Sequence, residues 1–254
     1  RDYGLAIYLM DLEIVDENQT RLFNNEGDFI PDVDETAAKM DGRGVDNNFV
    51  ASYFPDVFIQ DRSSGQVLYA PASVAALQAV GQNDNIAKPW FAPAGFSRGA
   101  LASVTNVKVR LTAVDRDTLY ESRINPIATF PNSGFVIFGQ KTLQLAQSAL
   151  DRVNVRRMLL DVKRAVIGVA RRILFEQNTP ATRARFVSQV TPLLALVQAQ
   201  QGIDQFRVVM DDTNNTQDDV LNNQLNGKIA IVPTRAVEFI AIDFIIDQAG
   251  VTFV

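Results

Sequence analysis

The chain has 254 residues, of which 47% are hydrophobic and 21% charged, and its net charge is −5 because 24 basic residues face 29 acidic ones. These values are typical of a globular protein with a sizeable core, and the negative balance argues against a general affinity for nucleic acid or for an anionic membrane. The sequence contains no cysteine and no histidine. Disulfides, thiolate nucleophiles, Ser-His-Asp triads and metal sites built on these two residue types are therefore excluded, while carboxylates, lysines and hydroxyls remain.

The first 45 residues predict one short strand followed by a polar region. Residues 5–10 are apolar and partly β-branched or aromatic, which favours a strand. The acids of residues 28–35 lack the spacing of a calcium loop, so we interpret them as a solvated loop with a helix starting near Asp34. The chain starts at Arg1 without a methionine, and it has no leader-like or membrane-spanning apolar run. We therefore expect an excised fragment of a longer soluble protein.

The next region predicts strands and one helix. Residues 49–60 are aromatic and β-branched, and Pro55 marks a break or a bulge within them. A short strand is expected at residues 66–69. A proline and a serine then open a helix at residues 74–80, with Gly81 as its stop signal.

A loop rich in proline, glycine and aromatic residues spans residues 89–101 around Trp90, the only tryptophan. Such a loop could bind a ligand. Arg98 is its only ionisable residue, however, so we interpret it as a structural loop that a buried Trp90 anchors.

The region after this loop predicts a strand, a capped helix and a second strand. A strand is expected at residues 107–111, and Thr112 with Asp115 three positions later predicts a capped helix. The turn-rich residues 124–134 are expected to form a loop that leads into a strand at residues 135–138.

One near-match to a phosphate-binding loop needs to be excluded. Gly134, Gly139, Lys141 and Thr142 approach the required pattern, but Gln140 is inserted before the lysine. The residues between the glycines are apolar and strand-forming, whereas a phosphate cradle needs a flexible loop with inward-pointing amides. We predict no nucleotide site here.

A strongly basic helix is expected from Arg152 onward. A helical projection places its apolar residues on one face and its basic residues on the adjacent face. The basic face is either a solvated surface or a docking surface for an anionic partner. The candidate residues of such a docking surface are Arg152, Arg156, Arg157, Lys163, Arg164 and Arg171.

The C-terminal third predicts a second helix and three strands. Thr179 and Pro180 start the helix, and Pro192 should kink it. Residues 211–223 are rich in acids and amides, and we favour side-chain turns over a cation site there. Strands are expected at residues 206–210, 228–232 and 238–247. The last one is suited to pairing with another chain, through Glu238, Ile240, Ile242, Phe244 and Ile246.

Six blocks of the sequence resemble the tail sheath proteins of contractile bacteriophages, in that family's order. They are WFAPAGFSRG (90–99), LYESRINPI (119–127), GFVIFGQKTL (134–143), LDRVNVRRML (150–159), FRVVMDDTNNT (206–216) and IVPTRAVEFIAIDF (231–244). The resemblance covers residues 46–254. Residues 1–45 match less well, so we expect them to belong to a preceding or inserted domain or to a linker.

The resemblance implies a mixed α/β fold in which a central β-sheet is flanked by helices, as a subtilisin-like sheath core with a C-terminal sheath domain. It implies a structural subunit without cofactor, metal or enzymatic activity. Such subunits polymerise around a tail tube protein and contract to drive the tube through the host envelope, and terminal arms add strands to sheets of neighbouring subunits. The expected location is the virion, after assembly in the host cytoplasm, and neither nucleic acid nor a membrane is an expected partner.

Two further expectations complete this interpretation. An N-terminal arm would lie upstream of Arg1, so the fragment alone is expected to be monomeric. The alternatives are a carboxylate-based hydrolase of a phage tail, which needs two convergent carboxylates, and a generic structural adaptor.

Overall fold

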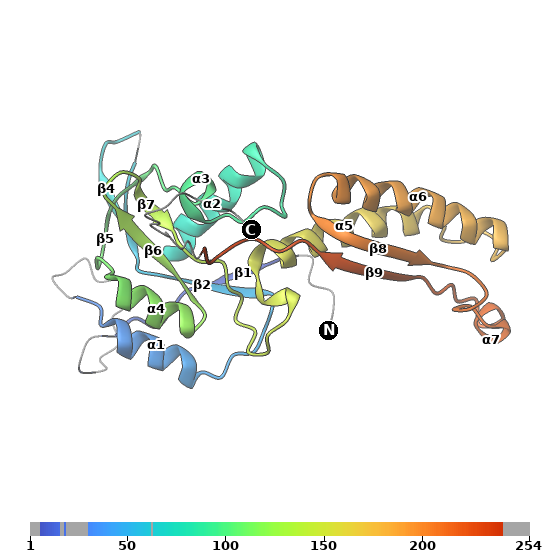
Figure 1. Cartoon of the computed structure of the whole chain (residues 1–254), viewed down its shortest axis with the longest axis horizontal. Helices are drawn as coiled ribbons and strands as arrows, with labels where there is room; N and C mark the ends of the chain where they lie inside the picture. Colours follow the sequence, from blue (N-terminus) through green and yellow to red (C-terminus); the bar gives the residue numbers. More distant parts are fainter. Residues whose placement is uncertain (1–5, 16–17, 19–29, 62, 241–254) are drawn as a thin grey trace, which may run out of the picture.

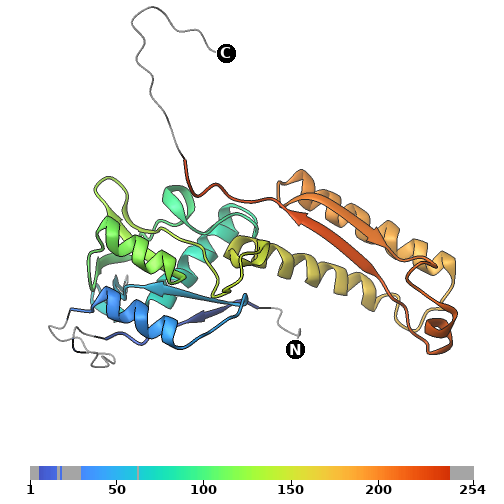
Figure 2. The ribbon, with the colours of Figure 1, turned by 60° about the horizontal axis from the view of Figure 1, so that its bottom comes forward.

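The computed structural model describes residues 6–15, 18, 30–61 and 63–240. Figure 1 shows an α/β body beside an elongated lobe that the last third of the described chain forms. Figure 2 shows helix α5 (Val153–Arg171) leading out of the body into this lobe. The short 3-10 helix η1 (Ala149–Asp151) precedes it.

The main sheet has the order β1-β2-β6-β7 and occupies the centre of the body. Strands β1 (Tyr8–Met10), β2 (Val50–Phe54) and β6 (Ile124–Phe130) are parallel, and β7 (Gly134–Ile137) runs antiparallel to β6. Most residues of β2 and β6 are buried, as expected for parallel strands that are covered on both faces.

The prediction of a loop at residues 124–134 is wrong for β6. Asn125 and Pro126 suggested a turn, but both lie in a strand, where hydrogen bonds to other parts of the chain satisfy their polar groups. The Asn125 amide nitrogen donates to the carbonyls of Ser52 (3.0 Å) and Lys141 (2.9 Å), and its oxygen accepts the Lys141 amide (2.6 Å). The carbonyl of Pro126 accepts from the Phe138 amide at 2.8 Å. Burial and these bonds outweigh the local turn propensity.

A second, antiparallel sheet has the order β4-β3-β5. It consists of β3 (Val57–Gln60), β4 (Val67–Ala70) and β5 (Val104–Val107). The predicted break at Pro55 is confirmed, because it separates β2 from β3. Strand β5 begins three residues before the predicted strand at 107–111 and overlaps it only at Val107.

Helices cover both faces of the main sheet, which confirms the predicted mixed α/β class. On one face α1 (Val33–Gly42) packs beside α4 (Ala113–Glu121), and together with β2 and β6 they bury a core that includes Met40, Phe54 and Leu119. On the other face α2 (Ala72–Ile86) packs its alanines against the sheet, next to the short helix α3 (Gly95–Arg98).

The observed helix ends show which of the predicted capping and stop signals are correct. The predicted cap of α4 is confirmed, since the Asp115 amide donates to the Thr112 hydroxyl (3.2 Å) and the Thr112 amide to the Asp115 carboxylate (2.7 Å). Helix α1 begins close to the predicted site near Asp34. Gly81 was wrongly predicted as a stop, because α2 continues through it to Ile86. The buried alanine face of α2 offsets the roughly 1 kcal/mol that a mid-helix glycine costs.

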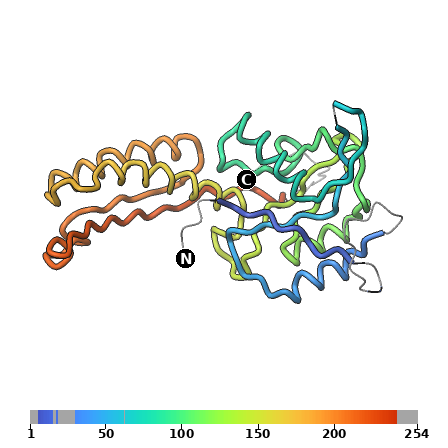
Figure 3. Tube along the Cα trace, turned by 180° about the vertical axis from the view of Figure 1, so that it is seen from behind, coloured from blue at the N-terminus to red at the C-terminus, as the bar shows by residue number. Residues whose placement is uncertain are grey.

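The elongated lobe pairs two helices with a two-stranded sheet. Helix α6 (Pro180–Ala199) begins at the predicted cap Thr179 and contains Pro192. Strands β8 (Ile203–Val209) and β9 (Lys228–Pro233) are antiparallel, and α7 (Gln217–Leu221) lies between them in sequence. Figure 3 shows the strand pair running alongside α5 and α6. The lobe has a core of its own, to which the predicted apolar face of α5 contributes Val155, Met158, Val162 and Val166, and Ile173 adds to it just after the helix.

The described part of residues 1–45 packs into the same body. Strand β1 pairs with β2, and α1 packs on α4. The assignment of these residues to a preceding or inserted domain or to a linker stays a prediction.

Candidate functional site

Two of the predicted basic-helix residues, Arg156 and Arg157, are buried in the structure. Arg156 is 4% exposed, donates to the backbone oxygen and the side chain of Asn48, and lies 3.9 Å from the ring centre of Phe49. Arg157 is 7% exposed and forms an ion pair with Asp84. An exposed basic face is therefore wrong for these two residues. A helical projection gives directions around the axis, but it does not show that the first turns of α5 are enclosed by the body.

The other basic residues divide along the helix. Arg152, the N-cap residue of α5, is half-buried and binds acids on both sides, namely Asp151 at 3.2 Å and Glu238 at 2.7 Å. Lys163 is partly buried, whereas Arg164 and Arg171 are exposed on the elongated lobe. The exposed cationic surface of α5 is thus confined to its C-terminal half.

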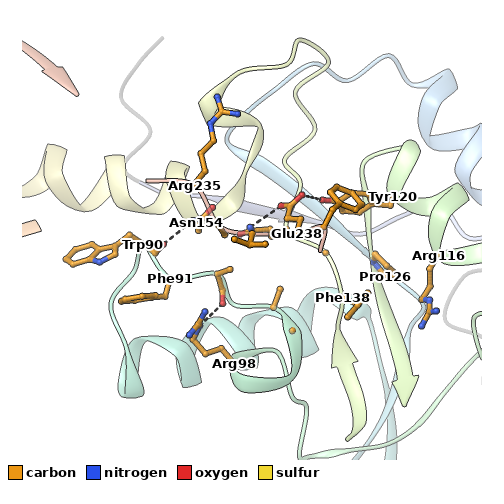
Figure 4. A pocket seen from close by; sticks show the side chains of 18 of the residues that line it. Trp90, Phe91, Arg98, Arg116, Tyr120, Pro126, Phe138, Asn154, Arg235 and Glu238 are labelled. Atoms are coloured by element: carbon orange, nitrogen blue, oxygen red, sulfur yellow. Dashed lines mark hydrogen bonds between the residues drawn. The ribbon is translucent and has the colours of Figure 1, made fainter. Parts of the chain in front are cut away.

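The Glu238 carboxylate is the point where three parts of the body meet. It accepts hydrogen bonds from the Tyr120 hydroxyl (2.6 Å), the Arg152 Nε (2.7 Å) and the Gln140 Nε2 (3.1 Å). Tyr120 comes from α4, Gln140 follows β7, and Arg152 precedes α5. Only 17% of the Glu238 side chain is exposed. Figure 4 shows the Glu238 and Tyr120 side chains meeting, with a dashed line for their hydrogen bond. We call Glu238 with its three donors the Glu238 anchor.

The charges of the anchor stabilise one another. Burial alone would raise the pKa of Glu238, but hydrogen bonds from Arg152, Tyr120 and Gln140 outweigh it and the pKa is lowered. Burial and the nearby carboxylate raise the pKa of the Tyr120 hydroxyl. Burial followed by repulsion from Arg152 lowers the pKa of Lys141, whose Nζ lies 3.9 Å from the Tyr120 ring centre. At neutral pH the anchor is thus an ionised carboxylate held by neutral and cationic donors.

The anchor fixes the C-terminal segment, defined as residues 234–240, against the body. This segment contributes to the lining of a groove of about 490 Å³. Trp90, Phe91, Arg98 and Phe138 line other parts of the groove. The predicted burial of Trp90 is confirmed at 7% exposure, and its indole nitrogen donates to the Gln200 carbonyl at 2.8 Å. The loop at residues 89–101 is therefore a structural anchor that also forms groove wall.

Sequence comparison supplies the decisive observation. No family model matches the chain. It is 37% identical over 170 residues to the tail sheath protein of Vibrio phage KVP40, across 67% of this chain and 25% of that protein. It is 29% identical over 218 residues to the tail sheath protein of Enterobacteria phage T4, across 84% of this chain and 33% of that protein. The chain is a relative of phage tail sheath proteins. It spans about a quarter to a third of the length of these relatives.

Solved structures agree on the fold of this tail sheath relative. The sheath complex of an extracellular contractile injection system (PVC) in its contracted state matches with a TM-score of 0.75 at 22% identity, over 88% of this chain and 62% of that one. The contracted helical sheath of the anti-feeding prophage matches with a TM-score of 0.70 at 24% identity, over 79% and 57%. At these identities the likeness concerns the fold.

The structure describes only two of the predicted strand-pairing residues. Glu238 and Ile240 lie in the described chain, where residues 238–240 form no strand. Ile242, Phe244 and Ile246 lie outside the described residues. Sequence reasoning singled out Glu238 but missed its partners Tyr120 and Gln140. The signal was present, since both stand in blocks that resemble tail sheath proteins, and Gln140 is a polar insertion after an apolar strand.

Several acidic residues outside the Glu238 anchor form local hydrogen bonds. The Asp211 carboxylate accepts from the Thr213 amide at 2.9 Å, and the Asn215 amide nitrogen donates to the Asp211 carbonyl at 3.0 Å, which confirms side-chain turns in the first part of residues 211–223. The turn interpretation is wrong for residues 217–221, which form α7. Within the described residues no group of three or more acids is arranged to hold a metal ion. No described helix is long and apolar enough to cross a membrane.

Proposed function

We propose that this chain is a portion of a structural subunit of a contractile phage tail sheath, which polymerises around a tail tube and contracts to drive the tube through the host envelope. The observation that carries the proposal is the 37% identity to a tail sheath protein over 67% of the chain. Electron microscopy of the full-length protein tests it, with long cylinders as the expected result. A full-length protein that forms only dispersed particles under assembly conditions would contradict it.

The body is proposed to be a subtilisin-like core that has no protease activity. A parallel sheet with helices on both faces supports the architecture. The absence of histidine from the sequence excludes a Ser-His-Asp triad, so the proposed role is structural. No cofactor or nucleotide is needed, because the free energy of contraction would come from different subunit contacts in two lattices.

The two-stranded sheet of the elongated lobe is the proposed receiving surface for strands of neighbouring subunits. Within the described chain β8 and β9 pair only with each other, so each has an outer edge that can pair further. Ile229 and Ile231 pack toward the helices while Lys228, Ala230 and Val232 are exposed, which gives β9 the alternation of a half-buried strand. Residues 238–247 are the proposed donor strand, and Glu238 is the residue at which this strand would leave the body of its own subunit.

The exposed basic residues of α5 are the proposed contact to the tube or to another subunit. Arg164 and Arg171 are exposed and Lys163 is partly buried, whereas Arg156 and Arg157 are buried. In the full-length protein, charge reversal at Arg164 and Arg171 should weaken tube attachment and reduce its salt dependence. If attachment keeps its strength and its salt dependence, the tube does not bind this surface.

The isolated chain is proposed to be monomeric, because a sheath lattice needs arms from several subunits. Sedimentation that finds a single monomer species supports this, and sheath-like tubes would overturn it. The proposed location of the full-length protein is the virion, after assembly in the host cytoplasm. Neither the hydrolase nor the adaptor alternative gains support from the described residues, whose acids serve turns, caps and ion pairs.

A further inference from the structure

The turn that follows α5 exposes two large apolar side chains. Leu174 is 66% exposed and Phe175 is 96% exposed. The turn itself is anchored, because the Glu176 amide donates to the Ile173 carbonyl at 3.0 Å and the Ile173 side chain packs into the core of the lobe. The fold therefore holds the Phe175 ring at the surface.

The backbone of Phe175 is also in an unfavourable conformation. Its φ angle is +71°, in the left-handed region that glycine adopts freely and a bulky residue seldom does. The exposed ring is unfavourable as well, since its apolar surface stays in water. Strained residues of this kind are concentrated at functional sites, where other contacts offset the strain. Phe175 thus has the character of a contact residue whose partner lies outside the chain.

This turn lies at the end of the lobe that is far from the body (Figure 2). Asn154, near the start of α5, lines the groove of the body, whereas Arg171 ends the helix just before the turn. At 1.5 Å of rise per residue, the helix between them spans about 25 Å. Phe175 therefore cannot enter the groove of its own chain.

Helix α7 lies at the same end of the lobe. The Asn178 Nδ2 donates to the Gln224 carbonyl at 3.0 Å, which ties the segment after the turn to the residues after α7. On α7, Leu221 is 74% exposed. Asp218 is exposed too, and it forms no ion pair within the described residues. We call Leu174, Phe175 and Leu221 the lobe tip.

The groove of the body has an apolar, aromatic lining. Phe138 and Phe239 line it and are 43% and 81% exposed. Phe96 is 55% exposed, and its ring centre lies 5.9 Å from that of Phe138. The exposed phenylalanines of the described residues are these three and Phe175. The groove, at about 490 Å³, is large enough to take an aromatic side chain.

The groove also carries positive charge without a carboxylate partner. Arg98 and Arg116 line it, and their guanidinium carbons lie 5.2 Å from the Phe91 ring centre and 5.7 Å from the Phe138 ring centre. Neither arginine forms an ion pair within the part of the chain that the structure describes. The carboxylate of Asp218 beside the lobe tip would complement them.

We propose that the lobe tip of one copy of this chain inserts Phe175 into the groove of a second copy, with Asp218 directed toward the groove arginines. The contact joins two different surfaces, so it can repeat from copy to copy, as in a helical array. One aromatic ring buries about 150–250 Å², against about 800 Å² per partner in a stable interface. The chain therefore stays monomeric in dilute solution. The proposal rests on the proposed function, since it names a neighbouring sheath subunit as the partner.

Cross-linking between two single-cysteine variants tests this contact, because the chain has no cysteine of its own. Gln177→Cys lies beside the turn and Ala113→Cys in the groove lining, while the control Asn85→Cys is exposed on α2 outside the groove. With a short bifunctional thiol reagent in concentrated solution, Gln177→Cys should link to Ala113→Cys about tenfold faster than to Asn85→Cys. Equal rates would overturn the proposal.

Removing the ring provides a second readout. Phe175→Gly, added to Gln177→Cys, should lower the linking rate to that of the control. The thermal unfolding midpoint should stay unchanged or rise, because glycine adopts the φ angle of this position without strain. A linking rate that ignores Phe175→Gly would overturn the proposal.

The assembled full-length protein separates this proposal from the proposed function. There Gln177→Cys should link to the groove of another subunit, and a link to the tail tube protein instead would overturn the proposal. Cylinders without the groove link would contradict this contact alone. A chain that links as expected in solution while the full-length protein forms no cylinders would contradict only the proposed function.

Discussion

A single carboxylate joins three elements of the body to the C-terminal segment. Glu238 receives hydrogen bonds from Tyr120, Gln140 and Arg152, and two of these donors are neutral. Removing its charge leaves the Arg152 guanidinium half-buried with only Asp151 beside it. The segment therefore depends on this residue more than on its exposed apolar side chains.

Glu238→Gln should release the C-terminal segment locally without unfolding the body. A hydrogen bond to a charged group contributes about 1.5–3 kcal/mol, so amide exchange across residues 234–240 should speed up by roughly one to two orders of magnitude. Hydrogen exchange with mass spectrometry measures this. The matched control is Glu176→Gln, because the pair of Glu176 with Arg185 is about half exposed on both sides. Unchanged protection in Glu238→Gln would show that the carboxylate does not hold the segment.

Acid should release the same segment. The folded pKa of Glu238 lies below its ordinary value of 4.5, because the hydrogen bonds from Arg152 and its other donors outweigh burial. The stabilisation is therefore complete above pH 4.5 and is lost as pH falls through the lowered folded value. Exchange of residues 234–240 should rise as pH falls below 4.5, after correction for the intrinsic rate. In Glu238→Gln this rise should be absent, and an equal rise in both proteins would point to another group.

Sequence reasoning at the residue scale singled out two side chains of the Glu238 anchor but not their contacts. Arg152 and Glu238 were both singled out, yet their contact joins positions far apart in the chain. Arg156 was assigned to an exposed face, whereas it packs on Phe49 and binds Asn48. Long-range contacts of this kind leave no local pattern in the sequence.

At the scale of elements, signals within one turn of a helix were the most reliable. Thr112 and Thr179 were recognised as caps because a cap needs only its own side chain and the next three amides. Strand β6 and the full length of α2 were missed, since both are decided by packing partners from other parts of the chain. The apolar face of α5 was recognised by its period. The mixed α/β class was predicted from the resemblance to tail sheath proteins.

Two glycine substitutions should have opposite effects on stability. Gly81 lies inside α2, and a Cβ there would meet nothing within 4 Å, so Gly81→Ala should raise the free energy of unfolding by about 1 kcal/mol. Gly202 is enclosed, because a Cβ would lie 2.7 Å from Val197 and 2.9 Å from the Trp90 ring. Gly202→Ala should therefore lower the free energy of unfolding by about 1–3 kcal/mol. Denaturant unfolding measures both values, and a destabilising Gly81→Ala would contradict this account of α2.

At the scale of the whole molecule, the body and the elongated lobe have separate cores, and α5 and the C-terminal segment connect them. The segment leaves the strand pair at Pro233 and reaches the body at Glu238. It is thus a second link between the two parts, and it connects the sheet that we propose as receiving surface with the residues that we propose as donor strand. This arrangement suits a subunit that gives one strand and accepts others.

Shortening the full-length protein after Pro233 should separate folding from assembly. Both cores lie upstream of this point, so the shortened protein should keep most of its thermal stability. It should fail to form cylinders, because the proposed donor strand is gone. The full-length protein with Glu176→Gln serves as the assembling control. A shortened protein that assembles normally would contradict strand exchange.

The most direct measurement is a cryo-electron microscopy reconstruction of the full-length protein in its assembled form. The account predicts a hollow cylinder in which the sheet of β8 and β9 gains at least one strand that belongs to a neighbouring subunit. A cylinder in which this sheet stays two-stranded, or a protein that forms no cylinder at all, would contradict it.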